Sequence, residues 1–243
     1  MSGCNIAFIP FRSGSTRLPN KNILPLAGLP LATWSLIAAN KCKLIDKIIL
    51  STDKKKFYDQ IVSSADEVIK INKEIIFDHR LPEHAGSKVK IFDYIKNNLR
   101  ESMAGNDDSL VQMLPTSPFR SIDTLKKALQ LYLDTGVGKF SATEYSFRVS
   151  FAFSIDNGQA LPLFEDNPMI TGNTQSQNHP LMYHPCGVFN IFKMSDARSK
   201  MTTIYDRCEA IIVKREESFD IDTLEDYTFM NLIADDFKRK LLS

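Results

Sequence analysis

Short apolar segments of strand length alternate with longer segments of helical periodicity over the first two thirds of the chain. Apolar residues that recur every three or four positions bury one face of a helix, whereas a short continuous apolar run is typical of a buried strand. This alternation predicts an α/β fold of three layers, a mostly parallel sheet with helices on both faces. The expected strands are 6–11, 46–50, 67–71, 109–114 and 140–143, and the expected helices are 31–41, 54–65, 89–99 and 121–133. Ligands of such sheets bind beyond the carboxyl ends of the strands.

The segment 145–188 interrupts the alternation. It is rich in asparagine, glutamine, proline and aromatic residues, and only 150–155 alternates weakly. We interpret it as an inserted hairpin and loop arm that serves as an oligomer contact or as a lid over a substrate. Strands are expected again at 187–192 and 210–214, followed by a final helix over 224–238. The 243 residues therefore predict a single domain with one inserted arm.

The composition excludes several classes of partner. Lys and Arg number 30 and Asp and Glu number 29, so no overall charge attracts a nucleic acid. No stretch approaches the roughly 20 apolar residues that cross a membrane, and the N-terminus lacks the basic region of a signal peptide. The four cysteines form no CxxC pair, which is typical of reduced thiols. We expect a cytoplasmic protein that binds neither nucleic acid nor membrane.

The loop after the first expected strand is suited to phosphate groups. Residues 13–16 are small, so the backbone can approach a ligand and direct its N–H groups at it. Arg12, Arg17 and Lys21 add three cations, which suits a nucleoside triphosphate. The loop matches neither the Walker A motif nor GxGxxG. A solvated basic loop remains the alternative.

Two aspartates follow an apolar stretch near the end of the chain. Strand alternation across Asp220, Ile221 and Asp222 places both carboxylates on one side. Two hard oxygen donors on one face suit Mg²⁺, which takes its other ligands from water and substrate phosphates. The alternative is a helix cap, in which Asp222 pairs with Glu225 or Thr223 with Asp226.

A third group of polar residues follows the expected strand 109–114. Gln112, Ser117 and Arg120 lie at or just beyond its carboxyl end. An ordinary strand-to-helix turn, with Ser121 as the helix N-cap, is the alternative.

Six segments in order resemble the CMP-sialic acid synthetase (acylneuraminate cytidylyltransferase) family. They are IPFRSGS at 9–15, PNKNI at 19–23, PLAGLPL at 25–31, ILSTD at 49–53, QMLPTSPFR at 112–120 and FDIDTLED at 219–226. The resemblance spans nearly the whole chain. It implies a nucleotide-diphospho-sugar transferase-like fold, CTP as co-substrate and Mg²⁺ as cofactor. It also implies a homodimer formed through the arm.

The resemblance assigns roles to individual residues. Arg12, Lys21 and Asp222 inherit catalytic roles, and Asp220 and Asp222 inherit the metal. Arg80, in a segment that partly matches the family's RPxxLA, joins the nucleotide site. The inherited nucleotide-binding residues are Arg12, Ser13, Gly14, Ser15, Arg17, Lys21, Asn22 and Arg80, and the substrate-binding residues are Gln112, Ser117, Arg120, Tyr183 and His184.

Departures from the family pattern occur in the loop, at Phe11 and Thr16, and on the sugar side. His184 and Cys186 replace the Arg and Asn of the family's RPNG, and Gln175 and Gln177 lie where relatives often carry arginine. We therefore expect a related nonulosonic acid, such as pseudaminic or legionaminic acid, as an alternative to N-acetylneuraminate.

Two other functions compete with this interpretation. The loop STRLPNK at 15–21 also resembles CMP-Kdo synthetases, but those carry GKP after the proline and QGDEP in mid-chain, where this chain has NKN and QMLPT. A non-catalytic nucleotide-sugar-binding protein on the same fold is the second alternative. Loss of Lys21 or of either aspartate would favour it, and all three are present.

Overall fold

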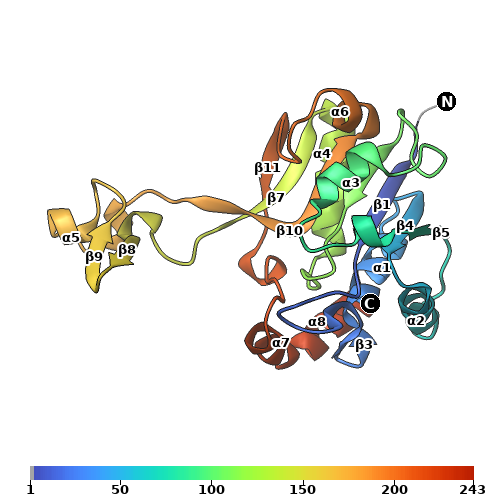
Figure 1. Cartoon of the computed structure of the whole chain (residues 1–243), viewed down its shortest axis with the longest axis horizontal. Coiled ribbons are helices and arrows are strands. Elements are labelled where there is room, and N and C mark those ends of the chain that lie inside the picture. The colour runs from blue at the N-terminus through green and yellow to red at the C-terminus, as the bar shows by residue number, and fades with distance from the viewer. Residues whose placement is uncertain (1–2) are drawn as a thin grey trace.

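A seven-stranded sheet forms the centre of the computed structural model, which describes residues 3–243 (Figure 1). The strand order is β11-β7-β10-β6-β1-β4-β5. Only β10 runs antiparallel to its neighbours, β6 and β7, so the predicted mostly parallel sheet is confirmed. The strands are β1 (Asn5–Pro10), β4 (Lys47–Thr52), β5 (Glu74–His79), β6 (Ser109–Gln112), β7 (Gly138–Glu144), β10 (Tyr183–Lys193) and β11 (Cys208–Ile212).

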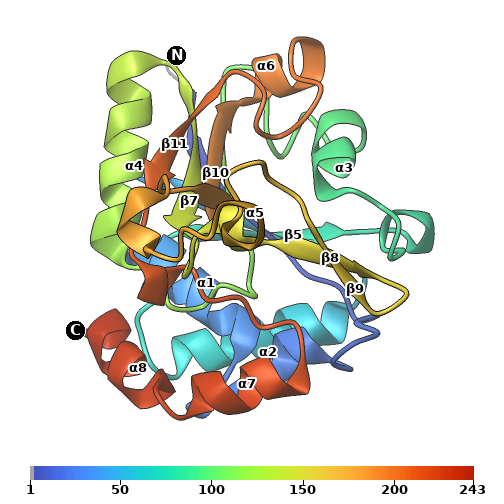
Figure 2. The ribbon, with the colours of Figure 1, turned by 90° about the vertical axis from the view of Figure 1, so that its left-hand side faces the viewer.

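Helices cover both faces of the sheet, as predicted. Strand alternation sends Ala7 and Ile9 into one buried cluster and Ile6 and Phe8 into another. We call the first side the α1 face and the second the α3 face; Figure 2 shows α4 and α3 on opposite sides of the sheet. The α1 face carries α1 (Leu31–Lys41), α2 (Lys55–Asp66), α4 (Ile122–Thr135), α7 (Leu224–Asn231) and α8 (Ala234–Leu242), and the α3 face carries α3 (Ile91–Asn97) and α6 (Met194–Ser199).

Helix α4 shows how local sequence sets an element that borders the site. The Ser121 side chain accepts a hydrogen bond from the Thr124 N–H, so the predicted N-cap is confirmed. Gly136 ends the helix in the left-handed conformation at φ 69°. The buried residues between them, Leu125, Ala128, Leu129 and Tyr132, follow the helical period and face the core.

The loop from β1 to α1 is built from short turns. A 3₁₀ turn, Lys21–Ile23, is followed by the two-stranded ribbon of β2 (Pro25–Leu26) and β3 (Leu29–Pro30). The remaining 3₁₀ turns are Pro82–His84, Val149–Phe151, Ser176–Asn178 and Arg215–Glu217. Within residues 3–243 no helix has both the length and the apolar character needed to cross a bilayer.

The segment between β7 and β10 forms an arm that extends away from the main body (Figure 1). Its hairpin pairs β8 (Phe153–Asp156) with β9 (Gln159–Pro162). Asn157 and Gly158 form the turn between them, both at positive φ, which is the preferred geometry of a two-residue hairpin. The short helix α5 (Pro168–Thr171) follows, and β10 leads the chain back into the sheet.

Two predicted elements were wrong. No strand forms at 67–71, because Val68 and Ile69 bond back to Ala65 at the end of α2 and pack against the core. The edge strand is β5 instead, eight residues after α2 ends. The expected final helix over 224–238 is two helices, because the N–H groups of Leu232 and Ile233 bond three residues back and break the α-helical ladder.

Gly187 tests the packing beneath the carboxyl ends of the strands. A Cβ added there would lie 2.6 Å from Ser117 Oγ and 3.1 Å from Leu114 Cδ1. We expect Gly187→Ala to lower the free energy of unfolding by about 1–3 kcal/mol in urea titrations, because the site is already filled. Gly105→Ala is the matched control, since its added Cβ meets nothing closer than 3.7 Å. Equal stability of the two variants would contradict the packing described here.

Candidate active site

A cleft of about 400 Å³ opens at the carboxyl ends of the central strands. This is the place that the fold rule predicts for a ligand. Its walls come from the loop after β1, the end of β5, the start of α3, the turn after β6 and the segment before α7. The lining residues include Arg12, Ser15, Arg17, Lys21, Asn22, Arg80, Ser87, Leu114, Thr116 and Asp222. A larger cavity of about 530 Å³ lies between α1, α4 and α8 and contains neither the loop after β1 nor the aspartate pair.

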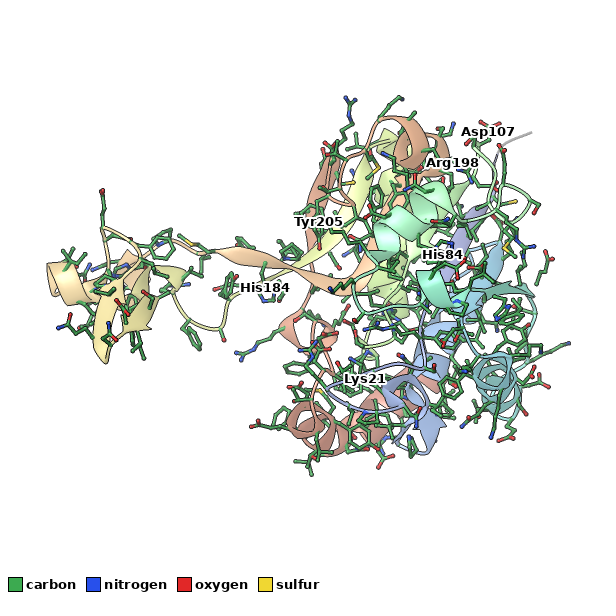
Figure 3. All side chains as sticks on the ribbon, in the orientation of Figure 1. Lys21, His84, Asp107, His184, Arg198 and Tyr205 are labelled. Atoms are coloured by element: carbon green, nitrogen blue, oxygen red, sulfur yellow. The ribbon has the colours of Figure 1, made fainter. Side chains whose placement is uncertain are left out.

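Ion pairs join the two distant ends of the chain inside this cleft. Lys21 Nζ lies 2.8 Å from Asp222 Oδ1, and Arg17 Nη2 lies 2.7 Å from Asp222 Oδ2. Lys21 is nearly buried, whereas Arg17 is open to solvent. Burial works to raise the pKa of Asp222, but the hydrogen bond and charge of Lys21, aided by Arg17, outweigh it and hold the pKa below its ordinary value. The structure thus brings the predicted cationic loop and the second aspartate together (Figure 3 labels Lys21).

The loop after β1 is held from below by Asp53, at the end of β4. The Ser13 N–H donates to Asp53 Oδ1 at 2.8 Å and the Ser13 hydroxyl to Oδ2 at 2.5 Å. Burial tends to raise the pKa of Asp53, but the two Ser13 donors outweigh it and the pKa lies below its ordinary value. A Cβ at Gly14 would meet no atom within 4 Å, so the space above the loop is open to a ligand.

Asn22 and Arg12 complete the loop. Asn22 is buried, and its side-chain amide donates to the Arg12 carbonyl at 3.1 Å. Arg12 Nη1 donates to the Ala85 carbonyl at 3.4 Å, which places its charge on the cleft wall. These bonds fix the backbone of the loop and leave its cations facing the space that they line.

Asp220 and Asp222 flank Ile221, which is buried and whose N–H donates to the Thr116 carbonyl at 2.8 Å. The segment lies outside the strands, so the strand alternation assumed for it does not apply. The Asp220 carboxylate accepts from Ser117 Oγ at 3.5 Å. It is open to solvent but sits in a recess of the protein, and this partial desolvation raises its pKa. The negative charge of Asp222 adds to the shift, against the hydrogen bond from Thr116.

The capping alternative is confirmed in its second form, the pair Thr223 and Asp226. Thr223 caps α7 in a box with Asp226, and the Asp222 N–H also donates to Asp226 Oδ2 at 3.0 Å. The side chains of Asp220 and Asp222 are therefore not used as caps. Within residues 3–243, no three His, Cys, Asp or Glu side chains gather closely enough to hold a metal ion. A metal at this cleft would take two carboxylates from the protein.

Arg80 lies at the end of β5 and lines the cleft. It is 2% exposed, donates to the Phe11 carbonyl and to the Ser51 carbonyl at 3.1 Å, and lies 5.9 Å above the Tyr94 ring. Its Nε has no partner within the described residues. Burial lowers the pKa of Arg80 against the opposing charges around it. Arg80 therefore borders the cleft with one donor unpaired, and its contact with a nucleotide stays a prediction.

Arg120 does not reach the cleft. It is fully buried, and its guanidinium donates to Ser35 Oγ and to three backbone carbonyls, Leu114 at 2.6 Å, Val188 at 3.1 Å and Gly187 at 3.4 Å. Burial lowers the pKa of Arg120 to about 9, so it keeps its charge at neutral pH. The residue ties the turn after β6 to β10. Although the resemblance places Arg120 among the substrate-binding residues, the structure gives it a supporting position outside the cleft lining.

The other predicted substrate residues divide into two groups. Gln112 ends β6, and Ser117, fully buried, contacts Asp220 in the turn that follows. Gln112 and Ser117 lie beside the cleft but are not among its lining residues. Tyr183 and His184 lie further away, where β10 leaves the main body for the arm (Figure 3 labels His184). Within this chain, the structure does not bring Tyr183 and His184 to the nucleotide loop.

Sequence reasoning missed two residues beside the cleft. Asp53 belongs to the ILSTD segment, but nothing in that segment shows that it holds Ser13. Asn190 is a buried amide within the apolar run of β10, and its position pairs with Gln112. A polar residue inside an apolar strand was the available signal.

Comparisons with known proteins agree with this geometry. The family model described as Cytidylyltransferase matches residues 6–145, more than half of the chain. The chain belongs to the cytidylyltransferase family. It is a CTP-dependent nucleotidyltransferase, and CTP is therefore the ligand expected against the loop after β1.

Three relatives resemble this cytidylyltransferase over much of its length. It is 25% identical to a pseudaminic acid cytidylyltransferase of Campylobacter jejuni over 231 residues, 94% of this chain and 95% of the relative. It is 32% identical to a CMP-N,N'-diacetyllegionaminic acid synthase of Legionella pneumophila over 165 residues, 66% and 68% of the two chains. It is 29% identical to an N-acylneuraminate cytidylyltransferase of Escherichia coli over 224 residues, 91% of this chain but 50% of the relative.

Solved structures confirm the fold of the cytidylyltransferase. A CMP:2-keto-3-deoxy-manno-octonic acid synthetase complexed with CTP matches with a TM-score of 0.60 at 12% identity, covering 96% of this chain and 99% of that one. A 4-diphosphocytidyl-2C-methyl-D-erythritol synthase matches with a TM-score of 0.66 at 9% identity and the same coverage. The predicted nucleotide-diphospho-sugar transferase-like architecture is thereby confirmed.

Asp53→Ala tests whether the loop must be held to bind CTP. We expect the KM for CTP to rise about tenfold, because Ser13 loses two hydrogen bonds to a carboxylate. At neutral pH the variant should also be slightly less stable, by no more than about 1 kcal/mol because Asp53 is partly exposed.

The pH dependence of that stability difference gives a second readout. The folded-state pKa of Asp53 lies below its unfolded value, so its contribution is present above about pH 4 and is lost as pH falls through the folded pKa. A difference that persists unchanged at lower pH would contradict the role given to the ionised carboxylate. Denaturant titrations from pH 7 to pH 3 measure it.

Proposed function

We propose that the enzyme transfers CMP from CTP to the anomeric hydroxyl of a sialic-acid-like nonulosonic acid and releases pyrophosphate. The observation that carries the proposal is the contact of Lys21 and Arg17 with Asp222 across one cleft. It supplies cations for a triphosphate and a carboxylate for a metal at the same place. The names of the pseudaminic, legionaminic and acylneuraminic acid enzymes support the choice of acceptor.

The chain's own residues do most of their work by positioning. Arg12, Lys21 and Arg17 receive the phosphates of CTP above the loop that Asp53 and Asn22 hold in place. The acceptor oxygen forms a bond to the α-phosphorus while the bond to the bridging oxygen of pyrophosphate breaks. Fixed cations around the phosphates stabilise the charge that develops on this leaving group.

Asp220 and Asp222 are proposed to hold Mg²⁺. The donor set fits, because this ion is commonly bound by one or two carboxylates together with substrate phosphates and water. When bound, the ion supplies charge neutralisation at the α-phosphate. Asp222 exchanges partners in this scheme: Lys21 and Arg17 turn from its carboxylate to the incoming phosphates.

The arm is proposed to join two copies of the chain. The arm exposes several large apolar side chains to solvent: Phe147 is 77% exposed, Ile155 72% and Leu163 60%. Such exposed apolar surface is typical of a protein–protein contact. A homodimer would cover them, and would give Tyr183 and His184 a partner surface that the single chain lacks. A cytoplasmic location fits an enzyme that consumes CTP.

A pyrophosphate-release screen tests the reaction. With Mg²⁺, the wild-type enzyme should release pyrophosphate from CTP, and not from ATP, GTP or UTP, when given pseudaminic, legionaminic or N-acetylneuraminic acid. Asp222→Asn should lower the rate at least about 100-fold, because one of the two carboxylates proposed to hold Mg²⁺ loses its charge. Asp59→Asn, which alters an exposed surface pair on α2, is the control. Activity with Kdo alone would favour the Kdo alternative, and no activity with any acceptor would contradict the proposal.

Sedimentation measurements test the homodimer. The wild-type enzyme should sediment at twice the 27.5 kDa of one chain. The double variant Phe147→Lys, Ile155→Lys should sediment as a monomer, because charged groups would be buried at the contact. Leu232→Lys, at a residue 78% exposed between α7 and α8, should remain dimeric. A wild-type monomer at micromolar concentration would contradict the proposed assembly.

A further inference from the structure

Two buried carboxamides lie side by side on the α3 face without a protein partner. Asn190 of β10 and Gln112 of β6 occupy paired positions in the sheet, and each is 5% exposed. Their neighbours Leu110 and Phe192 belong to the buried cluster of the α3 face, so alternation directs both amides to that side. Neither Gln112 Oε1 nor Asn190 Oδ1 has a hydrogen-bond partner within residues 3–243.

Other buried polar groups of this protein are paired where they serve the fold. On the same face, Asp78 accepts from Ser51 Oγ at 2.6 Å and from Tyr94 Oη at 2.8 Å. In α1, the buried Asn40 donates to the Lys70 carbonyl and accepts from the Asn72 N–H, both at 3.1 Å. Buried unpaired acceptors weaken a folded protein, and two adjacent ones therefore call for a ligand.

The pair lies next to the nucleotide cleft. Gln112 is two residues before Leu114, which lines that cleft, and it pairs with Phe8, two residues before the lining residue Pro10. On the other side Asn190 pairs with Phe140, whose ring meets that of Tyr205 at 5.2 Å. Tyr205 is 46% exposed and is labelled in Figure 3. The amides therefore lie between the phosphate loop and an aromatic side chain open to solvent.

The chemistry of the pair selects its ligand. A carboxamide offers an acceptor oxygen and two N–H donors. A carboxylate has only acceptors, so it cannot satisfy the two unpaired oxygens. The buried Lys139 is not available to such a carboxylate. It pairs with Ile191, the residue after Asn190, so its side chain points to the opposite face of the sheet, and it forms an ion pair with Glu209. Hydroxyl and acylamino groups both donate and accept, so they complement the pair.

We infer that Asn190, together with Gln112, forms a subsite for neutral hydroxyl or acylamino substituents of the sugar acid, with Asn190 as a specificity-determining residue. The inference rests on the proposed function. It adds that the hydroxyl or acylamino substituents of the acceptor are the part that lies beside the sheet. The carboxylate of the sugar is placed elsewhere. A substrate that lacks the donor leaves both oxygens unpaired and is rejected.

Asn190→Leu tests the inference, since leucine is of similar size and carries no hydrogen-bonding group. We expect the KM for an acylamino nonulosonic acid to rise at least tenfold and the KM for CTP to change less than twofold. The ratio of kcat/KM between that acid and an analogue without the acylamino group should fall towards one. The melting temperature should stay the same or rise, because an unpaired buried group has been removed.

Asn40→Leu is the matched control, because it removes a buried asparagine whose hydrogen bonds are made. Its melting temperature should fall by about 3 °C or more, with both KM values unchanged. If Asn190→Leu instead loses stability as Asn40→Leu does, or leaves the KM for the sugar acid unchanged, the subsite is overturned while the reaction stands. If the wild-type enzyme releases no pyrophosphate with any sugar acid, the proposed function fails, and the subsite fails with it.

Discussion

The contact between Asp222 and the cations Lys21 and Arg17 is the interaction on which the site depends. These residues are about 200 positions apart in the sequence. They meet because β1 lies beside β6 in the sheet, and the turn after β6 holds the segment that precedes α7 through the Thr116 carbonyl. Ile221 anchors that segment through the Thr116 carbonyl and through its buried side chain. Without this anchor the carboxylates would have no fixed position relative to the phosphate loop.

Much of the fold was predictable from the sequence, because apolar periodicity reports burial directly. The bounds of α1 were predicted to the residue, and those of β1, β4, α2 and α4 within two residues. The edge strand β5 was misplaced because Val68, Ile69 and Ile71 are apolar for a different reason: they pack against the core after α2 has ended. The break between α7 and α8 was also missed, because apolar residues continue through Leu232 and Ile233 with no glycine or proline to mark it.

The candidate site was predictable to a different extent. Clustered charges and small residues pointed to the loop after β1 and to the aspartate pair, and the structure places Lys21 and Asp222 in contact. The role of Asp53 depends on which strand lies beside β1, and the pairing of Asn190 with Gln112 depends on the register of an antiparallel strand. Neither the order nor the register of strands can be read from the residues of one segment alone. Arg120 shows the same limit, since its four acceptors come from three separate segments of the chain.

Strand β10 is one continuous piece of backbone from the arm into the sheet, where it pairs with β6. Tyr183 lies at its outer end and Asn190 lies in the sheet. Between them, Arg120 donates hydrogen bonds to the carbonyls of Gly187 and Val188. The buried guanidinium therefore holds the strand where its pairing with β7 is irregular, between Pro185 and Asn190. One strand thus carries both the return from the arm and the buried Asn190, so a substitution that displaces the arm would act on the same backbone element that borders the cleft.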